Sequence, residues 1–135
     1  MREFVMDKKM LTMGGVFYPT GHAVIMFPDK ADAERTAEAL VAEGGFPADA
    51  VASLSPATLL RDVAKSEEGS DIPLPSVGTE GATVRSFEAL ARKGHHGLVV
   101  VADSREDTER LMQIARRVEF SLAQKYRTLV IEDLN

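Results

Sequence analysis

Residues 97–102 form a run without a polar side chain, between His95-His96 and Asp103-Ser104. An apolar run without alternation is typical of a strand that is covered on both faces. A second strand candidate, at 22–27, starts with His22 and is apolar at the successive positions after it. The pattern therefore predicts two central strands that are buried above and below.

Apolar residues at helical spacing predict helices between the strands. The first follows Asp29 and ends at Gly44-Gly45, and the second starts at Ser55-Pro56. Two more run from about residue 80 to 93 and onward from Ser104. Asp29, Ser55 and Ser104 are residue types that cap helix N-termini. Weaker strands are predicted at 50–54 and 128–131, whereas residues 118–125 are ambiguous between helix continuation and a turn.

The order of elements predicts one domain over 1–135. It has an N-terminal arm (1–21), a first βαβ unit (22–54), a helical insertion and surface loop (55–95) and a second βαβ unit (96–135). The second unit echoes the first 74 positions later, in the strand and the aspartate that follows it. We therefore expect an α+β ferredoxin-like sandwich with a four-stranded, mainly antiparallel sheet, and a doubly wound α/β fold is the alternative.

A ferredoxin-like sheet carries helices on one face and leaves the other face open. Both faces of the two central strands are apolar, so the open face needs a cover. A second subunit, the N-terminal arm or the inserted helices could provide it. We predict a homodimer that packs through the sheet or exchanges its arms.

Composition narrows the class of protein. The chain has 135 residues, 44% of them hydrophobic and 27% charged, as expected of a globular domain. It has no cysteine, which excludes disulfides and thiolate sites and suits a cytoplasmic location. The charged start does not fit a signal peptide, and no apolar run reaches the roughly 20 residues that span a bilayer, so no membrane partner is expected.

Nucleic acid is not an expected partner either. The net charge is −5, which gives no global attraction for phosphate. An RNA-binding domain of ferredoxin-like fold stacks bases on aromatic residues of its central strands. Here those strands contribute only Phe27 and, at one end, His96.

The three histidines are the sharpest chemical candidates. If the two central strands are parallel neighbours, His22 and His96 lie at equivalent strand starts and come close together. Two adjacent imidazoles could bind a metal, hold an anionic ligand or act as acid and base, whereas the alternative is a pair of solvated strand-end residues. His95 points to the opposite face from His96. We name His22, His95 and His96 as candidate ligand-binding residues, and His22 and His96 as candidate catalytic residues.

No cofactor and no metal site is predicted, because the sequence lacks H-x-x-x-H and H-E-x-x-H patterns. The acidic residues near the predicted helix starts have structural explanations as caps or as partners of the helix dipole. These are Asp29, Asp32, Asp103, Glu106 and Asp107.

Residues 22–54 carry a strand, then Phe27-Pro-Asp-Lys-Ala-Asp-Ala-Glu, then Ala39-Leu-Val-Ala-Glu-Gly-Gly-Phe46, then a second strand at Ala50-Val51. This stretch resembles the small bacterial general-stress or heat-induced-stress domains. The resemblance covers about a quarter of the chain. It implies a ferredoxin-like domain of bacterial origin, and it supplies no catalytic residues.

These observations favour a non-enzymatic, homodimeric α+β domain that is stress-associated or regulatory and acts by binding. One alternative is a small-molecule sensor that resembles amino-acid-binding regulatory domains, with its pocket at the dimer interface. The other is a small dimeric ferredoxin-like enzyme that uses His22 or His96 as acid or base.

Overall fold

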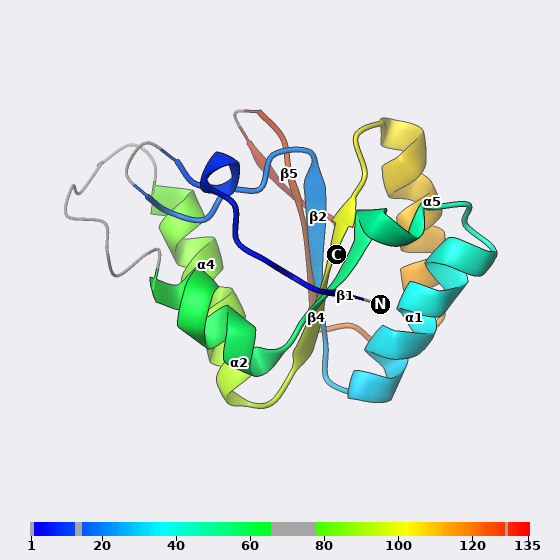
Figure 1. Cartoon of the computed structure of the whole chain (residues 1–135), viewed down its shortest axis with the longest axis horizontal. Helices are drawn as coiled ribbons and strands as arrows, with labels where there is room; N and C mark the ends of the chain where they lie inside the picture. Colours follow the sequence, from blue (N-terminus) through cyan, green and yellow to red (C-terminus); the bar gives the residue numbers. More distant parts are fainter. Residues whose placement is uncertain (1, 13–14, 66–77, 129) are drawn as a thin grey trace.

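The computed structural model describes residues 2–12, 15–65, 78–128 and 130–135, and the side chains of all of these except residues 78–80. Its centre is a six-stranded sheet with the strand order β1-β3-β4-β2-β5-β6. Figure 1 shows this sheet edge-on, with helices packed against both of its faces.

The two longest strands, β2 (His22–Phe27) and β4 (His96–Val101), are adjacent in the middle of the sheet, and both were predicted. Beside them lie β3 (Val51–Leu54) and β5 (Leu122–Tyr126). The edges are β1 (Arg2–Glu3) and β6 (Ile131–Asp133). β1 runs parallel to β3, and the other pairs of neighbours are antiparallel.

The predicted four-stranded sheet is therefore too small. The predicted arm contributes β1, and the stretch left ambiguous between helix and turn forms β5. The predicted last strand is displaced to residues 131–133, where it pairs with β5 as an antiparallel neighbour. Residues 66–77 of the predicted surface loop lie outside the described residues.

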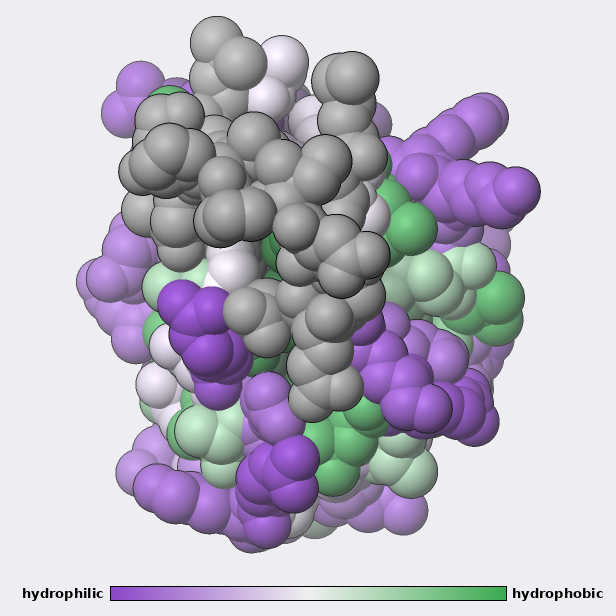
Figure 2. Space-filling view, turned by 90° about the vertical axis from the view of Figure 1, so that its left-hand side faces the viewer, coloured by the Kyte–Doolittle hydropathy of each residue, from purple (hydrophilic) through white to green (hydrophobic). Residues whose placement is uncertain are grey.

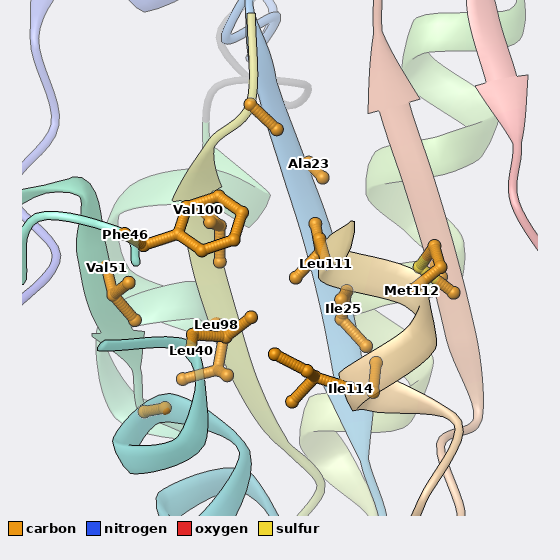
Figure 3. Packing of buried hydrophobic residues seen from close by; sticks show 14 of the residues in the cluster. Ala23, Ile25, Leu40, Phe46, Val51, Leu98, Val100, Leu111, Met112 and Ile114 are labelled. Atoms are coloured by element: carbon orange, nitrogen blue, oxygen red, sulfur yellow. The ribbon is translucent and has the colours of Figure 1, made fainter. Parts of the chain in front are cut away.

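Helices α1 (Lys30–Ala42) and α5 (Arg105–Ala115) cover one face of the sheet. Asp29 and Ser104 accept hydrogen bonds from the first-turn amides of these helices, which confirms both predicted caps. Between the helices and the sheet lies the core in Figure 3, where Leu40 and Leu111 approach Ile25 and Leu98 from the helix side.

Helices α2 (Pro56–Thr58) and α4 (Gly78–Arg92) cover the other face. α2 continues into the π-helical turn η3 (Leu59–Val63), and Ser55 caps it as predicted. Val84 and Phe87 of α4 are fully buried against the sheet. In Figure 2, which views this layer from outside, hydrophilic side chains surround smaller hydrophobic areas.

The N-terminal arm completes this second layer. It contains the 3₁₀ turn η1 (Lys8–Met10) and buries Phe4, Val16 and Phe17 against the sheet. The ring of Phe17 makes edge-on contacts with Phe4 and Tyr126, with ring centres 5.9 Å apart in each case. The predicted arm therefore lies on the body of its own chain.

The same chain thus covers both faces of β2 and β4, whose residues Val24, Met26 and Val99 are at most 3% exposed. The prediction that the second face is covered is confirmed, and the inserted helices and the arm are the cover. A second subunit is not needed for this burial. No helix in the described part of the chain is long and apolar enough to cross a membrane.

The covering role of α4 gives a testable prediction. Phe87→Ala removes a fully buried ring that packs on the sheet, so we expect it to lower the free energy of unfolding by about 3–5 kcal/mol. Urea unfolding measures this change. Val5→Ala is the control, because Val5 is 73% exposed and its truncation should change stability by less than about 0.5 kcal/mol. Equal, small effects of both substitutions would contradict the packing of α4 on the sheet.

Candidate functional site

The structure separates the histidines that the sequence analysis placed together. β2 and β4 are antiparallel, with His22 opposite Val101 and His96 opposite Phe27. A strand rises about 3.4 Å per residue, so the two histidines lie roughly 17 Å apart at opposite ends of the strand pair. They also face opposite layers, since alternation groups His22 with Val24 and His96 with Leu98. The predicted His22–His96 pair is therefore wrong.

His22 lies beside the N-terminal arm. Its Nδ1 donates a hydrogen bond of 3.0 Å to the Thr20 carbonyl, which fixes the proton on that nitrogen because a carbonyl only accepts. The ring borders a cavity of about 310 Å³ whose other walls include Phe4, Met6 and Val99. Arg2 and Asp7 also line this cavity, so His22 lies in a setting of mixed polarity.

His95 and His96 lie at the far end of the sheet. Ser121 Oγ donates to the Met26 carbonyl, so it accepts from Nδ1 of His95 over 2.9 Å. His95 thereby ties the start of β4 to the start of β5. Nδ1 of His96 is enclosed and has no hydrogen-bond partner among the described residues. Ligand binding by the three histidines stays a prediction.

A different set of residues forms a polar cavity at the N-terminal end of α5. This α5 cavity has a volume of about 320 Å³ and lies where the end of β4, the end of β5 and the segment before β2 meet. Its lining residues are Thr20, Gly21, Asp103, Ser104, Arg105, Thr108, Lys125, Tyr126, Arg127 and Thr128.

Lys125 is the unusual member of the α5 cavity. It sits on β5 opposite Ala23 and points to the α5 side of the sheet, where it is only 5% exposed. Within the described ranges it is the one charged residue that is buried, and its side chain forms no hydrogen bond or ion pair there. Its ammonium is not among the fully enclosed polar atoms without a partner, so Nζ retains an open side. Lys125 is one of the residues that line the α5 cavity.

Burial lowers the pKa of the Lys125 ammonium below its ordinary value. The carboxylate of Asp103 raises this pKa and is the strongest effect opposing burial, whereas the positive charge of Arg127 lowers the pKa further. Asp107 and Glu132 also favour the charged form. Burial outweighs these carboxylates because none of them is close enough to form an ion pair with Nζ.

The remaining charges of the cavity divide into paired and unpaired groups. Arg105 binds Glu109 at 3.2 Å, and Arg127 binds Glu132 at 3.1 Å. Asp103, in contrast, has no hydrogen bond or ion pair to any described residue. The unpaired charges of the lining are therefore one cation, Lys125, and one anion, Asp103.

Gly21 holds the backbone against Asp103. Its φ of +81° is open to glycine, and a Cβ there would lie 2.7 Å from Asp103 Oδ1. Gly21 also donates to the Tyr126 carbonyl and accepts from the Ala102 amide. These bonds fix the position of Gly21, which leaves space for the carboxylate at the cavity wall.

The helix end adds donors. Ser104 Oγ accepts from the amide of Asp107, and the first two amides of α5 have no partner within a helix. Together with Lys125 they favour a ligand that carries negative charge. No group of three or more His, Asp or Glu residues in the described ranges could hold a metal ion.

The sequence analysis missed Lys125 and interpreted Asp103 differently. Lys125 lies in the stretch left ambiguous between helix and turn, so its inward direction was not predicted. Asp103 was explained as a cap or dipole partner, but Ser104 performs the capping. The one sequence signal for Asp103 was its place in the internal repeat, where an aspartate follows each of the two central strands.

Comparisons with known proteins do not assign the chain to a family. No family model matches it, and neither the curated proteins nor the solved structures contain a significant match.

Lys125 gives a prediction for stability. Lys125→Met keeps a long side chain and removes the buried charge, so we expect it to raise Tm at neutral pH by a few degrees, where 1 kcal/mol is worth about 2–8 °C. Between the lowered folded pKa and the ordinary lysine value of about 10.4, the unfolded chain binds more protons. Wild-type stability should therefore rise with pH in that window, and the advantage of Lys125→Met should shrink.

Thermal unfolding at a series of pH values measures the difference between the two proteins. Lys93→Met is the control, because Lys93 is exposed and its replacement should have little effect at any pH. A Lys125→Met protein that is less stable than wild type at neutral pH would contradict the account of an uncompensated buried charge.

Proposed function

We propose that this chain is a non-enzymatic binding domain, regulatory or stress-associated, and that a small molecule with an anionic group occupies the α5 cavity. The observation that carries the proposal is Lys125. Burying an ammonium without a partner costs free energy, and a bound anion would offset that cost in the working state of the protein.

The position of Lys125 strengthens this argument. A cation near the N-terminal end of a helix meets the positive end of the helix dipole, which is an unfavourable arrangement. An anion bound between Nζ and the first amides of α5 would reverse the sign of both interactions. One ligand group thus accounts for a buried charge and for the unused donors of the helix.

The fold class is part of the proposal. The inner strands have the order β3-β4-β2-β5 and are antiparallel, while α1 and α5 lie on the same face. This arrangement supports a ferredoxin-like core, extended by one strand at each edge and by a second helical layer. It is compatible with the resemblance of residues 22–54 to bacterial stress domains.

An enzyme that uses His22 and His96 together has no support, because the two residues lie at opposite ends and on opposite faces of the strand pair. An enzyme that uses one of them as acid or base stays an alternative. A binding function needs no such pair. The homodimer and the cytoplasmic location stay predictions, and a second copy would have to use a surface other than the covered sheet face.

The proposed site can be tested by an NMR titration with acetate and with inorganic phosphate. We expect saturable shifts of the amides of Gly21, Arg105 and Glu106, because these amides lie at the α5 cavity or at the first turn beside it. Lys125→Met should abolish the shifts, and the exposed-lysine control Lys93→Met should retain them. Shifts scattered over other basic surfaces, or no shifts with either anion, would refute the proposed function.

A further inference from the structure

We infer that the ligand of the α5 cavity is zwitterionic, with its carboxylate at Lys125 and its ammonium at Asp103, as in a free amino acid. The inference rests on the proposed function, because it places the ligand in the same cavity. It adds the chemical class of the ligand and assigns a binding role to Asp103.

The charge balance of the lining carries the inference. Arg105 and Arg127 already have carboxylate partners, so only Lys125 and Asp103 are left without one among the described residues. These two charges sum to zero. A simple anion would satisfy Lys125 and be repelled by Asp103, whereas a simple cation would leave Lys125 uncompensated. A zwitterion satisfies both charges at once.

The placement of the two groups supports the same conclusion. Asp103 lies between the end of β4 and the N-cap of α5, whereas Lys125 lies on β5. The two side chains therefore line the cavity from different elements of the fold. Asp103 acts electrostatically on the Lys125 ammonium, yet the two side chains form no ion pair. A gap too wide for a direct ion pair but bordered by opposite charges suits a molecule that bears both charges on a short skeleton.

Size and polarity of the cavity agree with a small ligand. A water molecule occupies about 30 Å³ in the liquid, so the volume of about 320 Å³ equals roughly ten waters. The lining also contains hydroxyl groups, on Thr20, Ser104, Thr108 and Thr128. A free amino acid fits this volume and finds hydrogen-bond partners along the walls.

The inference can be tested with glycine, acetate and methylammonium. Acetate carries only the carboxylate of glycine, and methylammonium carries only its ammonium group. Isothermal titration and amide shifts measure their affinities for the wild-type protein. We expect glycine to bind about tenfold more tightly than acetate, the factor that one further charge-assisted hydrogen bond gives. Methylammonium should bind most weakly, because Lys125 repels it.

Substitutions then separate the roles of the two charges. Asp103→Asn should lower the affinity for glycine to that for acetate. The affinity for acetate should stay the same or rise. Asp49→Asn is the matched control, since Asp49 is exposed, lies outside the α5 cavity and makes no side-chain hydrogen bond among the described residues. Lys125→Met should abolish binding of both glycine and acetate.

The outcomes distinguish the inference from the function on which it rests. Acetate that shifts the cavity amides while glycine binds no more tightly would overturn the zwitterion and leave the anion site in place. Undiminished glycine binding in Asp103→Asn would also overturn it. If neither acetate nor phosphate shifts the cavity amides, the proposed function fails and the inference fails with it.

Discussion

The fold depends on a sheet whose central strands are apolar on both faces. β2 and β4 place buried side chains alternately into two cores, one under α1 and α5 and one under α2, α4 and the N-terminal arm. Burial of apolar surface is worth about 25 cal/mol per Å², so neither face of these strands can be left in water without a large loss of stability. The long insertion between β3 and β4 exists, in physical terms, to close the second face.

Much of this arrangement could be predicted from local patterns. β2, β4 and the caps Asp29, Ser55 and Ser104 were predictable because an uninterrupted apolar run and an N-cap are signals within a few residues of sequence. Pairing direction was not, and it decided where the histidines lie. β5 was missed because its strand alternates weakly and its inward position is a lysine, which a hydrophobic pattern assigns to solvent.

The candidate site follows from that same exception. Among the described residues the interior is apolar or hydroxyl-bearing except at Lys125, where a charge replaces the expected aliphatic side chain. The exception lies at the end of the sheet, where the cover by α5 begins and a cavity opens. Asp103 and Gly21 meet it only in the folded chain, through strands far apart in sequence, so no local motif could indicate the set. The residues that a sequence scan favours, the three histidines, contribute nothing to it.

The central claim is that one copy of the chain covers both faces of its own sheet. Native-state hydrogen exchange of the β2 and β4 amides, measured across a wide range of protein concentration, tests it most directly. The account predicts that these amides exchange only through global unfolding, with protection that is independent of concentration. Protection that falls on dilution would show that a second copy supplies part of the cover, and would contradict the account.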